Sequence, residues 1–340
     1  MRQKVIFSRL LLLIIVSNKL PFSPSIFAQQ PIEKVIFDHD GGIDDLLSLM
    51  LLTQMDDIEL LGVCVTPADC FLEDATISSL KILKLAGNDI SQVAKGNNRA
   101  VNPFPNEWRA QPMVANALPR MLNTTEDYDQ LSKLSADEFM AEQVRSSEEP
   151  VTILITGPCS NLVSMLEKYP ELKARINEVV WMGGAVDVGG NVATHKHNKS
   201  AEWNAYWDPY ATNDLLKHQL NLKLISLDVT NSVPINLTFL QRLAQQSEFP
   251  LSDLASQLWA TTINTIPSYE YTYFMWDVLA TSYVNQPGLF EAERIELDSS
   301  IELPNQGQTF RSPGNNQWVN VVKKVNVDSF YEYVLFLLEE

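Results

Sequence analysis

Cysteine is scarce in this sequence, with only 3 among 340 residues. Cys64, Cys70 and Cys159 are too few, and odd in number, for a disulfide framework, and their spacing matches no zinc site. We therefore expect buried thiols. One bridge between two of them stays open as an alternative, should the protein work in an oxidising compartment.

Basic side chains are also in short supply, because 25 Lys and Arg stand against 42 Asp and Glu, a formal net charge of −17. A chain this acidic repels polyanions, so we expect neither nucleic acid nor an anionic membrane as a partner. Long apolar runs are missing as well. No stretch after the N-terminal segment approaches the roughly 18 residues of a membrane-spanning helix, and we expect a soluble mature protein.

The N-terminal segment has the pattern of a secretory signal peptide. Basic residues precede the apolar run Leu10–Val16, which is too short to span a bilayer, and Ala28 supplies a small residue for cleavage. We predict that residues 1–28 are removed and that residues 29–340 form the mature domain. The expected location is secreted or periplasmic.

The stretch VIFDHDGGIDD, residues 35–45, is the richest in chemistry. Its first three residues are typical of a strand, and the apolar segment Leu46–Met55 is typical of a helix. Four carboxylates lie between them: Asp38, Asp40, Asp44 and Asp45. Acids this close repel one another unless a cation lies among them, and an oxygen-only cluster suits Ca²⁺ or Mg²⁺. The alternative is a solvated acidic turn that only caps the helix.

Strand and helix patterns alternate along the rest of the chain. Helical spacing appears at Asp74–Ala86 and Leu162–Glu167, and a long polar region before Ser147 is also expected to be helical. The expected strands are Ile58–Val65, Val93–Lys95, Val151–Ile155, Val179–Met182 and Leu222–Leu227. This alternation predicts one α/β domain, a Rossmann-like and mostly parallel sheet with helices on both faces. Ligands of such folds bind at the carboxyl ends of the strands.

Six ordered motifs carry a resemblance to a known family. They are DHDGGIDD, GVCVTPADC, LITGPCSNL, WMGGAVDVGGN, AEWNAYWDP and MWDVLA. Together they resemble the nucleoside hydrolases, which cleave the N-glycosidic bond of ribonucleosides with a bound Ca²⁺. The resemblance implies a single α/β domain, a ribonucleoside substrate and a homodimer or homotetramer.

The resemblance also implies a metal site and a general base. Asp40, Asp45, the backbone carbonyl of Thr156 and Asp277 match the family's Ca²⁺ ligands. Asp40 matches the base that takes a proton from the Ca²⁺-bound water as it attacks C1′, with Asp38 behind it. The chemistry is sound, because a cation lowers the pKa of water and fixes its position.

Sugar and base contacts follow from the same matches. The expected ribose contacts are Asp44, Met182, Asn191, Glu202, Asn204 and Asp277. Trp276 and Asp69 stand where relatives that accept both inosine and uridine carry His and Asn, which makes the chain similar to the purine-specific subclass. There two tryptophans sandwich the base, roles that match Trp108 and Trp276, while Asp69 would accept a hydrogen bond from the nucleoside. For Trp203, Trp207 and Trp259 we expect core packing.

Two alternative functions are also compatible with parts of the sequence. The opening strand also resembles that of haloacid-dehalogenase-like phosphatases, where Asp38 would be the nucleophile, Asp40 the acid/base and Mg²⁺ the metal. That chemistry needs a late acidic pair, and the only late acidic motif near the expected position is Trp276-Asp277. An exported nucleoside-binding protein is the non-catalytic alternative, although such a protein has no need of a metal-binding acid cluster.

Overall fold

The central strands of the sheet coincide with apolar runs of the sequence. The computed structural model describes residues 32–99, 101–193, 197–265 and 272–339, so the predicted signal peptide lies outside it. The strands are β1 (Glu33–His39), β2 (Ile58–Val65), β3 (Gln92–Lys95), β4 (Leu131–Ser135), β5 (Val151–Ile155), β6 (Ile176–Met182), β7 (Leu222–Ile225), β8 (Phe290–Ser299), β9 (Thr309–Arg311) and β10 (Trp318–Val325). Within these ranges they form a ten-stranded sheet in the order β4-β3-β2-β1-β5-β6-β7-β10-β8-β9.

The sheet is parallel from β4 to β10, and β8 and β9 then add to it in antiparallel fashion. The order in the sheet reverses between β1 and β5, because the chain first moves toward β4 and later toward β7. In an open α/β sheet such a reversal leaves a crevice at the carboxyl ends of the strands. The acid-bearing end of β1 lies at this point.

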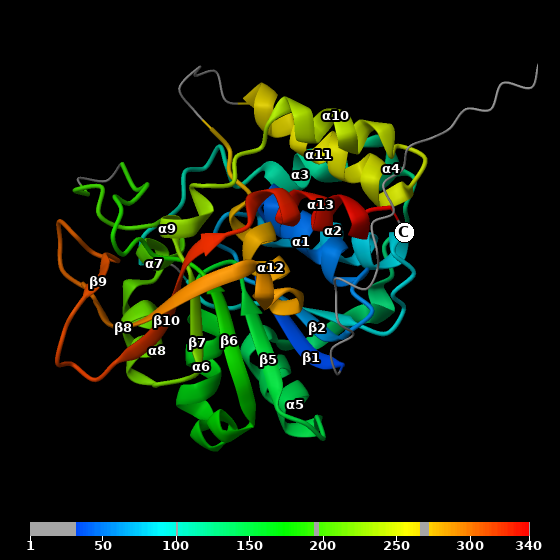
Figure 1. Cartoon of the computed structure of the whole chain (residues 1–340). Coiled ribbons are helices and arrows are strands. Elements are labelled where there is room, and N and C mark those ends of the chain that lie inside the picture. Colours follow the sequence, from blue (N-terminus) through cyan, green and yellow to red (C-terminus); the bar gives the residue numbers. More distant parts are fainter. Residues whose placement is uncertain (1–31, 100, 194–196, 266–271, 340) are drawn as a thin grey trace, which may run out of the picture. The chain divides into compact units, whose positions relative to one another are not determined.

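Helices cover both faces of the sheet, as predicted (Figure 1). They are α1 (Ile43–Leu52), α2 (Leu72–Leu85), α3 (Gln111–Asn116), α4 (Pro119–Leu122), α5 (Ala136–Ser146), α6 (Ser160–Lys168), α7 (Trp203–Trp207), α8 (Pro209–Lys217), α9 (Leu227–Thr230), α10 (Leu237–Gln245), α11 (Pro250–Thr265), α12 (Trp276–Asn285) and α13 (Val327–Leu337), with short 3₁₀ turns at η2 (Tyr128–Gln130), η3 (Pro170–Arg175) and η4 (Pro287–Leu289). Helices α5, α6 and α8 lie on one face, and α1, α12 and α13 on the other. No helix of the described residues has the length and apolarity to cross a bilayer.

Burial explains why the central strands are continuous apolar runs. All five residues of β5 are buried, and so are Val35–Phe37 of β1. A strand covered by helices on both faces has no solvent side, so it loses the polar alternation of a half-exposed strand. The three cysteines are free and buried, which confirms the prediction of buried thiols.

The structure corrects two expectations and adds three strands that had not been predicted. The region before Ser147 contains an edge strand, β4, whose sequence LSKLS is too polar to stand out as a strand. Leu227 belongs to α9 rather than to the preceding strand, because Ser226 begins a single helical turn there. Strands β8, β9 and β10 had not been predicted; β10 pairs in parallel with β7, and the β10–β8 and β8–β9 pairs are antiparallel.

Candidate active site

The acidic stretch leaves β1 and enters α1 through two glycines. Gly41 adopts a φ of +85°, and a Cβ at this position would lie 2.7 Å from the Cβ atoms of both Cys70 and Ala75. Glycine is therefore required for the turn to pass so close to its neighbours. The Gly42 N–H then donates to Asp45 Oδ2 at 2.7 Å, so this carboxylate caps the helix that carries it.

Asp277 meets the acids of α1 from the start of α12. One oxygen from each of Asp44, Asp45 and Asp277 lies within 4.8 Å of the others. Asp40 lies beside this group and accepts a hydrogen bond from the Asp69 N–H at 3.2 Å. Residues more than 200 positions apart in the chain thus share one site. This group contains Asp44, which had been expected to bind ribose, and Asp40 lies outside it.

Burial and crowding raise the pKa of most of these acids. The pKa of Asp44 rises to about 7, first because the group is buried and then because Asp45 is close. Burial and acidic neighbours also raise the pKa of Asp40, Asp69 and Asp277. A divalent cation would relieve this repulsion, and a donor set made only of oxygens fits a hard ion such as Ca²⁺ or Mg²⁺.

These acids lie in the wall of a cavity of about 810 Å³. Every site residue predicted from the sequence lines it: Asp40, Asp44, Asp45, Asp69, Trp108, Thr156, Met182, Asn191, Glu202, Asn204, Trp276 and Asp277. No Lys, Arg or His belongs to the lining within the described part of the chain. A strongly acidic cavity of this size suits a small neutral or cationic ligand, with or without a metal ion.

Asn204 connects the acid cluster to two backbone carbonyls in the cavity wall. Asn204 Nδ2 donates to the carbonyl of Thr156 at 2.8 Å and to that of Met182 at 3.1 Å. The Thr156 hydroxyl donates to Asp45 in turn. Asn204 therefore fixes the ends of β5 and β6 beside the acids.

Glu202 is held by backbone groups. Its carboxylate accepts from the N–H groups of Asn204 at 2.8 Å and Ala205 at 3.2 Å, and so caps α7. It also accepts from the Gly184 N–H at 2.9 Å. Burial raises the pKa of Glu202 to about 7 in spite of these donors. The side chain thus joins α7 to the segment after β6.

Aromatic rings form two further parts of the cavity wall. Trp108 packs edge-on against Trp203, with ring centroids 5.2 Å apart, and Trp203 packs against Phe104 at 5.2 Å. Elsewhere in the wall, Trp276 packs against Tyr273 at 4.7 Å. The Tyr273 hydroxyl donates to Asp44 at 2.9 Å, which links these rings to the acid cluster.

Sequence reasoning missed part of this wall. Trp203, Trp207 and Trp259 are buried in the core, as predicted, but Trp203 also lines the cavity, which had not been predicted. A buried ring and a ring that faces a cavity give the same apolar signal in a sequence. The one available hint was its position between Glu202 and Asn204. Tyr273 and Phe104 also line the cavity, and neither had been assigned a contact with the ligand.

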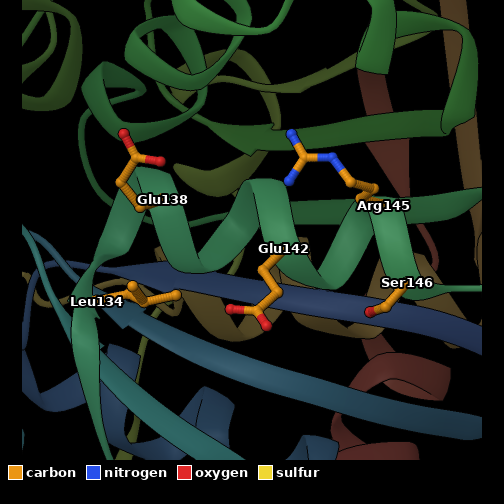
Figure 2. A pocket seen from close by; sticks show the side chains of 5 residues that line it. All are labelled: Leu134, Glu138, Glu142, Arg145 and Ser146. Atoms are coloured by element: carbon orange, nitrogen blue, oxygen red, sulfur yellow. The ribbon is translucent and has the colours of Figure 1, made fainter.

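A second depression, of about 400 Å³, lies along α5 and is a poor candidate. Figure 2 shows Glu138 and Arg145 projecting from one side of the helix and Glu142 from the other. Glu138 is already paired with Lys168 at 2.8 Å, and the Arg145 guanidinium lies over the ring of Tyr169. The charged groups do not converge on a common point, so the large cavity is the candidate active site.

Comparison with known proteins points to the same place. Residues 35–332 match the family model described as inosine-uridine preferring nucleoside hydrolase. A solved structure of an inosine-uridine preferring nucleoside hydrolase from Bacillus anthracis is similar with a TM-score of 0.84 and 36% identity, covering 90% of this chain and 99% of that one.

Two curated relatives extend the comparison. Uridine nucleosidase 1 of Arabidopsis thaliana is 25% identical over 331 residues, which cover 89% of this chain and 92% of the relative. The pyrimidine-specific ribonucleoside hydrolase RihA of a Shewanella species is 31% identical over 208 residues, covering 59% and 61% respectively. The similar proteins therefore include enzymes whose names specify pyrimidine substrates.

Proposed function

The chain belongs to the inosine-uridine preferring nucleoside hydrolase family, and from this premise we propose that it hydrolyses the N-glycosidic bond of purine ribonucleosides to ribose and free base. The observation that carries the proposal is the convergence of the acid cluster, the polar sugar-side residues and the aromatic wall on one cavity. Family membership separates the chain from the phosphatase alternative, and it makes the chain a glycosidase rather than a passive binding protein.

The acids suit a bound calcium ion. We assign its binding to Asp40, Asp45, the Thr156 carbonyl and Asp277, with Asp44 close to the same group. When bound, the ion supplies an acidified and well-positioned water. Asp40 would accept the proton of the attacking water. A carboxylate among uncompensated acids holds a proton more readily than one in solvent, and burial raises the pKa of Asp40 accordingly.

The sugar side suits ribose and its transition state. Asn191, Glu202, Asn204 and Met182 line the cavity beside Asp44, and carboxylates and amides are well suited to hydroxyl groups. Glycosidic cleavage builds positive charge on the sugar ring, which nearby carboxylates stabilise. The many acids of the lining, and the absence of Lys, Arg and His from its described residues, suit a cationic transition state.

The aromatic wall supports a purine as the leaving group. Stacking on an aromatic ring contributes roughly 1–3 kcal/mol per base, and a purine offers more ring area than a pyrimidine. Trp108 and Trp276 line the cavity in separate ring clusters. We assign both to the base. We assign Asp69 the role of hydrogen-bond acceptor, because its buried Oδ1 has no hydrogen-bond partner among the described residues.

A nucleoside panel tests the proposal. Purified protein should release reducing sugar from inosine, adenosine or guanosine faster than from uridine or cytidine, and a chelator should stop the reaction until Ca²⁺ is restored. Faster cleavage of pyrimidine nucleosides would refute the purine preference while leaving the reaction class intact. Free phosphate from nucleotides, with no free base from nucleosides, would refute the reaction class.

Trp276→Ala tests the base site. The loss of one stacked ring should lower kcat/KM for purine nucleosides by about 5- to 150-fold, the equivalent of roughly 1–3 kcal/mol. Trp318→Ala is the matched control, because Trp318 lies on β10 outside the cavity, over Arg294. If affinity for free ribose falls as much as purine cleavage, the stacking role is wrong.

The signal peptide and the assembly remain our proposals. Residues 1–28 would direct export to the periplasm or the exterior, and the mature chain would form a homodimer or homotetramer. N-terminal sequencing of exported protein should begin near residue 29. Light scattering of the purified protein should give two or four times the mass of the mature chain.

A further inference from the structure

The segment after β6 reaches the cavity without regular structure. Residues 183–193 contain no helix or strand, yet Gly189, Gly190 and Asn191 stand in the cavity wall. Backbone N–H groups in such a segment have no ladder partners, so other groups must accept their hydrogen bonds. The partners they find determine where the segment lies.

Four consecutive N–H groups of this segment donate to side chains of other elements. The bonds run from Gly184 to Glu202 at 2.9 Å, from Ala185 to Thr309 Oγ1 at 3.0 Å, from Val186 to Asp228 Oδ2 at 2.8 Å and from Asp187 to Asp228 Oδ1 at 3.0 Å. Three elements thus hold one segment: α7, β9 and α9 (Figure 1). Only Glu202 among the acceptors was expected to be a site residue.

Asp228 makes two of these four bonds, and its carboxylate is fully engaged. It also accepts from the Ser226 hydroxyl at 2.8 Å and from Lys323. Its side chain is 4% exposed. Burial disfavours its charge, but the donated hydrogen bonds outweigh burial and lower the pKa of Asp228. An acid this well satisfied is a fixed structural anchor.

The neighbours of Asp228 connect the anchor to the cavity. Leu227 and Asn231, on the same turn of chain, line the cavity, and the Leu227 N–H donates to the Gly184 carbonyl at 3.0 Å. Asp187 is also held from outside by Arg311 at 2.7 Å and by Lys323 at 2.6 Å. The segment therefore lies between the cavity wall of α9 and the cations of β9 and β10.

We propose that Asp228 is a positioning residue, which sets where Asn191 and the two glycines meet the sugar by holding the amides of Val186 and Asp187. The proposal rests on the proposed function for its kinetic consequence. A small displacement of the groups that contact a substrate is enough to weaken substrate binding strongly. Strands β9 and β10 at the far end of the sheet then have a role, because they supply Thr309 and the counter-charge Lys323.

Kinetics of Asp228→Ala distinguish positioning from bulk stability. A displaced segment weakens ground-state and transition-state binding of the sugar alike, so KM should rise about tenfold with kcat nearly unchanged. Asp228→Asn keeps one acceptor oxygen and should lie between wild type and Asp228→Ala. Simple loss of folded protein would instead lower kcat at an unchanged KM, and that result would overturn the proposal.

Asp137→Asn is the matched control. Asp137 is also a well-buried acid that accepts from a backbone N–H, from serine hydroxyls and from a lysine, Lys168, but it lies on α5 away from the cavity. This variant should lose stability while its KM stays within about twofold of wild type, as expected when no substrate contact is displaced. An equal rise of KM in this control would also overturn the assignment.

Hydrogen exchange gives a readout that needs no turnover. In Asp228→Ala the amides of Val186 and Asp187 should exchange at least about tenfold faster than in wild type, with the amides of α5 unchanged. Unchanged exchange at both positions would overturn the proposal. If wild type cleaves no nucleoside, the proposed function fails, but exchange still decides whether Asp228 holds the segment.

Thr309→Val is the second variant, for use if Asp228→Ala does not fold. It removes the hydroxyl that both receives a hydrogen bond from Ala185 N–H and donates to its carbonyl at 3.1 Å, and it leaves no charge unpaired. The amide of Ala185 should exchange faster than in wild type. KM should rise about threefold, because one of the three elements that hold the segment loses its hydrogen bonds to it. A wild-type KM with wild-type exchange would show that the anchors do not act on the sugar site.

Discussion

Two groups of acids in this molecule differ in whether basic side chains pair with them. The cavity acids are Asp40, Asp44, Asp45, Asp69 and Asp277. They are packed together with no basic side chain in the described cavity wall, and Arg109, outside that wall, offsets only part of the rise in the pKa of Asp69. The paired acids are Asp187, Asp228 and Glu293, and they share Arg311 and Lys323.

The pKa values of the two groups move in opposite directions. Those of Asp40, Asp44, Asp69 and Asp277 are raised by burial and by like charge. Those of Asp187, Asp228 and Glu293 are lowered, because cations and N–H groups donate to them. The paired acids therefore stabilise the fold as it stands. The cavity acids weaken it until a cation or a substrate compensates them, which is the usual state of a functional site.

Asp40→Asn should give the largest effect on activity and test the cavity side of this comparison. Loss of the general base should lower kcat by at least about a thousandfold. Without metal, the free energy of unfolding should not fall, because one of several repelling charges is gone. Urea unfolding in chelator and a reducing-sugar assay measure the two quantities. Asp56→Asn, at an exposed position, is the control and should keep full activity; a stability loss confined to Asp40→Asn would break the comparison.

Calcium should stabilise the protein through the cavity acids alone. At a concentration a hundredfold above Kd, a ligand that binds only the folded state adds about 2.7 kcal/mol to the free energy of unfolding. Thermal unfolding with increasing Ca²⁺ measures this gain, and Asp277→Asn should lose most of it. An equal gain in that variant would place the ion elsewhere.

Lys323→Met tests the paired side. It leaves Asp228 buried without a counter-charge and should lower the free energy of unfolding by about 2 kcal/mol, less than for a fully buried pair because Lys323 is partly exposed. The kcat of the folded fraction should stay near wild type. Urea unfolding without metal gives the first quantity, and a stability equal to wild type would mean that the pairing contributes little.

Asp187→Asn should give the smallest effect. The pKa of Asp187 is lowered mainly by hydrogen bonds from Arg311, so its contribution is complete above the ordinary Asp pKa near 4 and is lost as the pH falls below it. Solvent screens this half-exposed pair, which limits the difference from wild type to about 1 kcal/mol or less at pH 7. The difference should shrink toward pH 2. Unfolding curves at pH 7, 5 and 3 measure it, and a difference that grows on acidification would reverse the sign argument.

The sequence was sufficient for the parallel half of the fold. The apolar runs at Ile58–Val65 and Val151–Ile155 coincide with β2 and β5. All of β5 and the last four residues of β2 are buried, and a strand without a solvent side is recognisable from its apolar composition. The polar edge strand Leu131–Ser135 has no such signal. The family model and the solved relatives confirm the predicted family and α/β fold.

The candidate site was predicted where residues are close in sequence or carry a family motif. All predicted residues line one cavity, although their individual roles stay predictions. Trp203 was correctly predicted to pack in the core, but its contact with the cavity was missed, because a buried ring and a ring that faces a cavity look alike in a sequence. Thr309 and Asp228 were missed because their partners lie 124 and 42 positions away, and side chain to backbone contacts over such distances leave no periodic pattern.

The location of β1 also bears on how the protein is synthesised. This strand is the first of the domain to leave the ribosome, yet it lies inside the sheet and pairs with both β2 and β5. One of its edges stays open until residues 151–155 have been translated, and the ion-binding group stays incomplete until Asp277 follows. A metal ion held by this group could thus stabilise only a chain that extends past Asp277, and a shorter nascent chain must be kept from aggregating by other means.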